Sequence, residues 1–147
     1  MERLLRLDRR IPRLLLAAAA GICVFGGAAH TAAFFATTST SISRSGLSPI
    51  LAAELKVLWL ADSTTLLALA LLFGFIAAKP NVASRAVIVL LAVMPAATAV
   101  LLYLFLGPFY AGHLLTAATV MVCLAGVLMR TDSGPVRTSL QHQGRGA

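Results

Sequence analysis

Four apolar stretches alternate with short polar segments along the chain. They cover about residues 14–36, 50–78, 83–106 and 109–129. Each is at least as long as the roughly 20 residues that an α-helix needs to cross the hydrocarbon core of a bilayer. The pattern therefore predicts an all-α integral membrane protein, built as a bundle of four transmembrane helices.

The polar segments between and beyond these stretches differ in character. Residues 1–13 form a basic leader whose leucine and isoleucine side chains share one helical face, which is typical of a helix lying on anionic lipid. Residues 37–49 are rich in Ser and Thr and predict an exposed loop. The polar tail, residues 130–147, is expected to be disordered in the cytoplasm.

Two features of the apolar stretches predict how the helices pack. The first stretch is rich in Ala and Gly, which allow close backbone approach in lipid, so this helix is expected at the centre of the bundle. Pro95 lies in the middle of the third stretch and predicts a kink there. The aromatic residues near the expected outer boundary match an interfacial belt, namely Trp59, Tyr103, Phe109 and Tyr110.

The composition supports a membrane protein and indicates its orientation. The chain is 59% hydrophobic and 12% charged, whereas soluble domains average about 45–50% and about 25%. A net charge of +7 would suggest nucleic acid for a soluble protein, but here the basic residues flank the apolar stretches. Ten of the twelve Lys and Arg residues fall on one side, leaving Arg44 and Lys56 on the other. The positive-inside rule then places both termini in the cytoplasm of a bacterial-type inner membrane, with no nucleic-acid partner.

Five polar residues, distant in sequence, fall in the outer half of this predicted bundle. They are His30, Glu54, Asp62, Tyr110 and His113. The inner half has almost no counterpart, so the sequence predicts one polar pocket near the outer surface, a hypothetical site for a ligand or a proton.

Asp62 is the most informative of these residues. An acidic side chain well inside a span is penalised by about 2.5–3.5 kcal/mol on insertion scales, so it must face protein or water. Glu54 lies two turns earlier on the same helical stripe. Asp62 is expected either to bind a proton, cation or other ligand, or to hold helices together by hydrogen bonding. A proton-coupled carrier that uses Asp62 is one alternative function.

His30 and His113 form a second possible centre. Two imidazoles at similar depth on different helices can ligate a b-type haem or flank a quinone, which would make the protein a membrane redox component. The alternative is a pair of separately hydrogen-bonded histidines. Cys23 and Cys123 lie in apolar stretches without metal-ligand spacing and are expected to be packed as small apolar residues.

The sequence carries no motif for hydrolytic or nucleotide-dependent catalysis, such as a P-loop, HExxH or GxSxG. The interpretation that remains is a small multi-pass membrane protein acting as a binding, transport-accessory or assembly component. Its expected partners are the lipid bilayer and, through the small-residue face of the first span, a second copy or another membrane protein.

Overall fold

The computed structural model describes residues 2–129 and is helical throughout, apart from the turns between helices, as the sequence predicts. The predicted tail, residues 130–147, lies outside the described residues. The elements are α1 (Glu2–Ala33), the π-helix η1 (Phe34–Thr38), α2 (Ser39–Ser43), α3 (Pro49–Ala78), the 3-10 turn η2 (Pro80–Val82), α4 (Arg85–Leu91), α5 (Val93–Leu106) and α6 (Tyr110–Leu128).

Four helices are long and apolar enough to cross a membrane, which agrees with the four predicted stretches. They cover Arg10–Ser43, Pro49–Ala78, Arg85–Leu106 and Tyr110–Leu128. Large apolar side chains are exposed along the outside of all four. Such a surface suits lipid rather than water.

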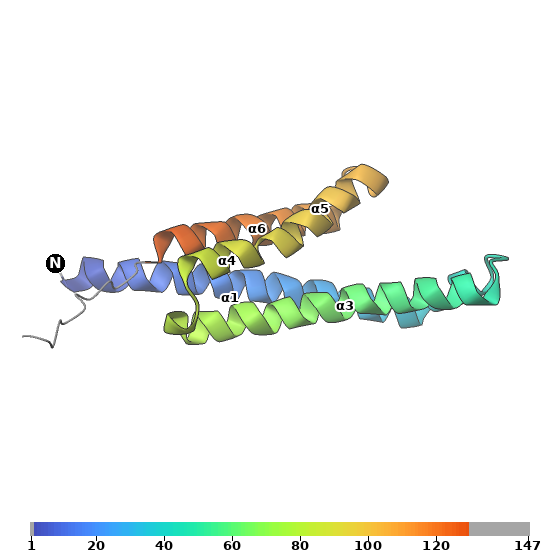
Figure 1. Cartoon of the computed structure of the whole chain (residues 1–147), viewed down its shortest axis with the longest axis horizontal. Coiled ribbons are helices and arrows are strands. Elements are labelled where there is room, and N and C mark those ends of the chain that lie inside the picture. Colours follow the sequence, from blue (N-terminus) through green and yellow to red (C-terminus); the bar gives the residue numbers. More distant parts are fainter. Residues whose placement is uncertain (1, 130–147) are drawn as a thin grey trace, which may run out of the picture.

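The helices form an open bundle with α1 at its centre, as its small residues predict. α1 packs against α3 on one side and α6 on the other, and α4 and α5 pack against α6 (Figure 1). We call the end that holds the α3–α4 turn and the C-terminal end of α6 the proximal end. The opposite end, with the α2–α3 and α5–α6 turns, is the distal end. There the α1–α3 hairpin extends past the α5–α6 turn, and α5 leans away from it (Figure 1).

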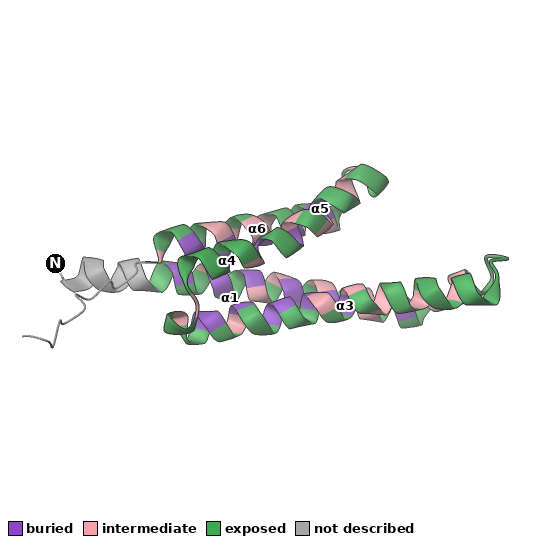
Figure 2. Ribbon diagram, in the orientation of Figure 1, coloured by how far each residue is buried: buried purple, intermediate pink, exposed green. Residues whose placement is uncertain are grey.

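The main apolar core lies in the proximal half. Its fully buried members come from α1, α3, α4 and α6, for example Leu16 of α1, Phe73 of α3, Ile88 of α4 and Val122 of α6. Figure 2 shows the buried surfaces facing inward there, whereas the distal stretches of α3 and α5 are mostly exposed. The distal half is therefore the looser part of the bundle.

Two arginines close helix ends at the proximal end. Arg13 of α1 donates from Nε to the carbonyl of Ala77, at 2.8 Å, and from Nη2 to that of Ala78, at 3.2 Å, where α3 ends. Arg85 of α4 donates to the carbonyl of Met129, just beyond α6. Cations at helix C-termini satisfy free carbonyls and interact favourably with the helix dipole.

The first long helix continues further than the sequence predicts. The loop expected over residues 37–49 is wrong, because η1 and α2 carry the helix to Ser43 and leave only residues 44–48 as the turn. The hydroxyls of Thr37, Ser41 and Ser43 each donate to the carbonyl four residues earlier. These bonds satisfy the polar side chains within the helix, so a Ser/Thr-rich segment can remain helical.

The third span is broken close to its proline. Pro95 has no N–H to donate to the carbonyl of Leu91, and the helix is interrupted at Ala92 between α4 and α5. Ala92 instead donates to the carbonyl of Val89, at 3.1 Å, in a tighter turn. The break changes the direction of α5 relative to α4. This change contributes to the divergence of α5 from the α1–α3 hairpin (Figure 1).

Candidate functional site

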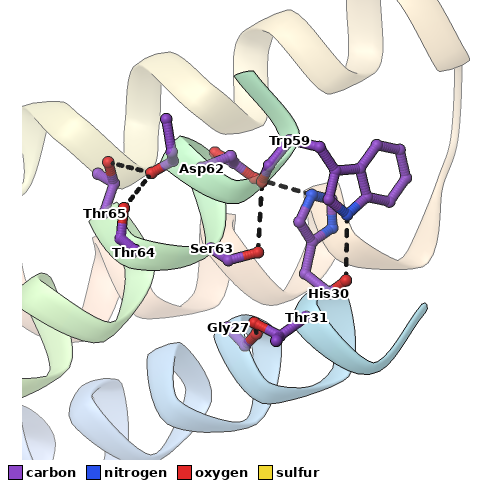
Figure 3. Close-up of polar contacts among 9 residues, drawn as sticks. Gly27, His30, Thr31, Trp59, Asp62, Ser63, Thr64 and Thr65 are labelled. Carbon is purple, nitrogen blue, oxygen red and sulfur yellow. Dashed lines mark hydrogen bonds and ion pairs between the residues drawn. The ribbon is translucent and has the colours of Figure 1, made fainter. Parts of the chain in front are cut away.

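Three side chains meet between α1 and α3 in the distal half of the bundle. His30 comes from α1, and Trp59 and Asp62 come from α3, where a spacing of three residues places them on neighbouring turns of one face (Figure 3). We call these three residues the His–Trp–Asp cluster.

The cluster is held by three contacts. The imidazole of His30 lies flat on the indole of Trp59, with ring centroids 4.1 Å apart and an interplanar angle of 5°. Nε1–H of Trp59 donates to the backbone carbonyl of His30, at 3.0 Å. Nε2 of His30 lies 3.5 Å from Oδ2 of Asp62. One residue of α1 thus contacts two residues of α3 through its ring and its backbone.

Gly27 allows the two helices to approach closely beside the cluster. A Cβ atom built at this position would lie 3.0 Å from Cγ of Leu67 and 3.2 Å from the carbonyl oxygen of Ser63. These distances are tighter than ordinary van der Waals contact, so a larger residue would push the helices apart. The glycine of α1 sets the spacing across which His30 reaches α3.

The nearby hydroxyls are occupied within their own helices. Ser63 is buried and donates to the carbonyl of Trp59, at 3.3 Å, and Thr64 and Thr65 both donate to the carbonyl of Ala61 (Figure 3). These hydroxyls therefore stabilise the local conformation of α3 and do not point their protons at the cluster.

A groove of about 370 Å³ runs from the cluster along the α1–α3 hairpin. Its lining residues are His30, Thr38, Ile42, Leu55, Leu58, Trp59 and Asp62. The groove is shallow and broadly open, and its exposed surface is almost wholly apolar. Its volume falls within the range of about 300–1,000 Å³ that is usual for small-molecule sites.

The π-helical segment η1 explains how residues of α2 reach the same groove as His30. In a regular α-helix, Thr38 and Ile42 would lie about 80° and 120° around the axis from His30. In η1 the N–H of Ser39 donates to the carbonyl of Phe34, five residues back, so one residue is absorbed without advancing the turn. This rotates Thr38 and Ile42 back toward the side that faces α3.

The cluster is partly open to its surroundings. The side chain of His30 is 29% exposed and that of Asp62 is 42% exposed. Asp62 is the only acidic residue in the lining, and no Lys or Arg is among the lining residues. Lys56 of the same helix points elsewhere, since its Nζ donates to Oγ of Ser43 at 2.7 Å.

A second polar cluster joins α5 to α6. The hydroxyl of Tyr103 lies 2.8 Å from Nδ1 of His113 and 3.5 Å from Oγ1 of Thr116. The ring of Tyr103 packs directly on Gly112, because a Cβ atom at this position would lie only 3.1 Å from the ring. His113 and Thr116 are exposed on α6.

The structure brings together only part of the predicted pocket. His30 and Asp62 meet, whereas His113 pairs with Tyr103 on the other side of the bundle. Glu54 is exposed near the start of α3, and Tyr110 is 62% exposed and contacts the ring of Phe109. The physical reason is the order of the helices: α6 packs against α1, α4 and α5, and it comes near α3 at Leu66, one turn to the proximal side of Asp62.

The two imidazoles give no geometric support to a shared haem or quinone site. The groove beside His30 contains no residue of α5 or α6, and His113 lies against Tyr103 of α5. Among the described side chains, residues 10–129, no group of three or more His, Cys, Asp or Glu residues is placed to hold a metal ion. Bis-histidine ligation would require the distal parts of α1 and α6 to be rearranged.

Sequence reasoning missed Trp59 as a member of the site and interpreted it only as part of an aromatic belt. A signal was present, because Trp59 and Asp62 are separated by three residues and so share a helical face. No signal pointed to Thr38 or Ile42, since their position depends on η1.

A search of known protein families found no match to this chain, and searches of curated proteins and of solved structures found none either. The function is therefore argued from the chain's own residues.

Proposed function

We propose that the protein is a multi-pass component of the cytoplasmic membrane with both termini in the cytoplasm. Four apolar helices with an exposed apolar exterior support the membrane location. Arg10, Arg13, Lys79 and Arg85 lie at the proximal end, and both acidic residues of the described side chains, Glu54 and Asp62, lie in the distal half. This distribution supports a cytoplasmic proximal end.

In that orientation the His–Trp–Asp cluster lies close to the outer boundary of the hydrocarbon core. α6 has 19 residues, which corresponds to a length of about 28 Å and matches a core of about 30 Å. Leu66 of α3 and Leu115 of α6 belong to one small core cluster. Asp62 lies one turn nearer the distal end than Leu66, so it is level with the first turn of α6. A carboxylate at this depth is penalised less than one at the bilayer centre, and Trp59 takes the usual interfacial place of its residue type.

We further propose that the protein binds a small amphiphilic molecule in the groove between α1 and α3. The observation that carries this proposal is the apolar groove together with the partly exposed carboxylate and imidazole at its rim. A few polar groups in a mostly apolar cavity are typical of ligand sites.

The experiment uses Trp59, which is the single tryptophan of the chain and lines the groove. The protein in phosphatidylcholine nanodiscs is titrated with dodecanol, dodecylammonium and dodecyl sulfate while tryptophan emission is recorded. We expect at least one of these probes to shift the emission saturably. Thr38→Phe, which fills the groove, should abolish the shift, and Thr40→Phe, outside the lining, should preserve it. If no probe gives a saturable shift, or both variants behave alike, the binding role is wrong.

A further inference from the structure

We infer that the groove selects amphiphiles with a positively charged amine headgroup, bound at Asp62 with the alkyl chain along the apolar lining. This inference rests on the proposed binding role and adds the chemical class of the bound molecule. Three features of the groove carry this inference. They are the negative charge of its lining, the unused hydrogen-bond acceptors of the Asp62 carboxylate, and the apolar surface that leads away from that carboxylate.

The charge of the lining favours a cation. Asp62 is the only formally charged residue that lines the groove. The two distal cations lie outside it, because Lys56 donates to Ser43 and Arg44 is in the α2–α3 turn. A negative group in a weakly polar environment attracts a cationic headgroup and repels an anionic one.

The geometry of Asp62 leaves its carboxylate open to hydrogen-bond donors. Nε2 of His30 lies 3.5 Å from Oδ2, a contact that is not a hydrogen bond. Among the described side chains, residues 10–129, no hydrogen bond engages either carboxylate oxygen, and the side chain is 42% exposed. Because the exposed surface of the groove is almost wholly apolar, the carboxylate stands at its rim. An ionised carboxylate accepts several hydrogen bonds, and N–H donors that carry a positive charge form the stronger ones. A primary ammonium group can therefore donate to the unoccupied oxygens of the Asp62 carboxylate.

The apolar lining extends from this polar end toward α2. Leu58, Leu55 and Ile42 follow one another along the hairpin, beyond the level of the cluster. A headgroup at Asp62 would leave an attached alkyl chain in contact with these side chains. Burial of each methylene contributes about 0.8 kcal/mol, so both ends of an amphiphile would add to its affinity.

The test compares the headgroups of the same three dodecyl probes on the wild type, Asp62→Asn and Glu54→Gln. Asp62→Asn keeps the shape and removes the charge, and Glu54→Gln removes the other carboxylate of α3, which lies outside the groove. We expect dodecylammonium to bind at least about tenfold more tightly than dodecanol, in keeping with a charge-assisted hydrogen bond. We expect dodecyl sulfate to bind most weakly. Asp62→Asn should abolish the preference and Glu54→Gln should retain it.

The outcomes separate this inference from the binding role. If dodecanol and dodecylammonium bind equally well, the binding role stands and the selection for amines is wrong. A preference that persists in Asp62→Asn would also overturn the inference. Circular dichroism and size-exclusion chromatography of Asp62→Asn, together with its retained binding of dodecanol, show whether the variant is folded.

The same amine chemistry occurs in membrane aminolipids and in free lipophilic amines. Nanodiscs that contain phosphatidylethanolamine distinguish the two sources. If this lipid competes with dodecylammonium in the wild type, the source is the membrane. If it does not compete while dodecylammonium still binds selectively, the source is a free amine. Spermine, whose amines are joined by short methylene spacers and which has no terminal alkyl tail, should not bind. Saturable binding of spermine with the affinity of dodecylammonium would overturn the requirement for an amphiphile.

Discussion

The indole of Trp59 is stacked on the imidazole of His30 and at the same time donates to the backbone carbonyl of His30. The two residues belong to different helices, so this double contact fixes both the distance and the rotation of α1 relative to α3. Any ligand site on this side of the bundle depends on that alignment.

Replacement of Trp59 should separate the two contacts. Trp59→Phe keeps a ring against His30 and removes the hydrogen bond of 3.0 Å, so we expect a loss of about 1 kcal/mol in the free energy of unfolding. Trp59→Ala also removes the stacked surface and should be clearly more destabilising. Far-UV circular dichroism during unfolding in mixed micelles with dodecyl sulfate measures both. Equal losses would mean that the stacking contributes nothing.

The close approach of α1 and α3 at Gly27 predicts a position-specific effect of alanine. Gly27→Ala places a Cβ 3.2 Å from the carbonyl oxygen of Ser63 and should destabilise the bundle by about 1–3 kcal/mol. Gly21→Ala is the matched control, because no atom lies within 4 Å of its Cβ position. This control should be neutral or more stable by up to about 1 kcal/mol, through helix propensity. The same unfolding measurement would contradict the packing if both variants behaved alike.

The second polar cluster predicts a difference between two tyrosines. Tyr103→Phe removes the hydroxyl that lies 2.8 Å from Nδ1 of His113 and should lower the free energy of unfolding by about 1 kcal/mol. Tyr110→Phe should change it by less than about 0.5 kcal/mol, because within the described chain the Tyr110 hydroxyl makes no hydrogen bond. A larger effect at Tyr110 would show that the α5–α6 cluster is placed differently.

Arg13 of α1, which donates to the last carbonyls of α3, is expected to stabilise the protein by more than its charge alone. Arg13→Met removes the bonds to the carbonyls of Ala77 and Ala78 and should destabilise the protein by about 1–2 kcal/mol. Arg10→Met removes the same charge from the same helix at an exposed position. Thermal unfolding in uncharged micelles compares the two. Equal effects would indicate that only the positive charge of this end matters.

The proposed orientation predicts which turns are accessible from outside the cell. In a background with Cys23→Ser and Cys123→Ser, Ser45→Cys in the α2–α3 turn should react with a membrane-impermeant maleimide in intact spheroplasts. Asn81→Cys in the α3–α4 turn should react only after permeabilisation. The reverse pattern would place the His–Trp–Asp cluster on the cytoplasmic side.

Much of the fold follows from the periodicity and composition of the sequence. Four helices, a central α1 and a break near Pro95 were predictable. They follow from the length of the apolar stretches, the small residues of the first stretch and the missing N–H of the proline. The helical continuation from Phe34 to Ser43 was not predictable, since the loop rule for Ser and Thr assumes that their hydroxyls compete with the helix. Here they bond to carbonyls of the same helix.

The position of the site along the bundle was predictable, but its partners were not. The sequence placed His30, Asp62 and His113 in one half of the bundle, because the residue count along a helix fixes the position along its axis. Which residues meet depends on the order and rotation of the helices, and these are set by Gly27, by the break at Ala92 and by η1. The pairing of His113 with Tyr103, rather than with Asp62, follows from these tertiary features.

The unequal lengths of the helices also have a consequence for the surrounding lipid. The helix over Arg10–Ser43 has 34 residues and α6 has 19, which correspond to about 51 Å and about 28 Å. In the proposed orientation the outer boundary of the hydrocarbon core lies level with the first turn of α6. The longer α1–α3 hairpin then extends past that boundary into the headgroup region, where the Ser and Thr residues of segment 37–43 suit the polar surroundings. The groove would therefore open among lipid headgroups, where the polar and apolar parts of the bilayer meet.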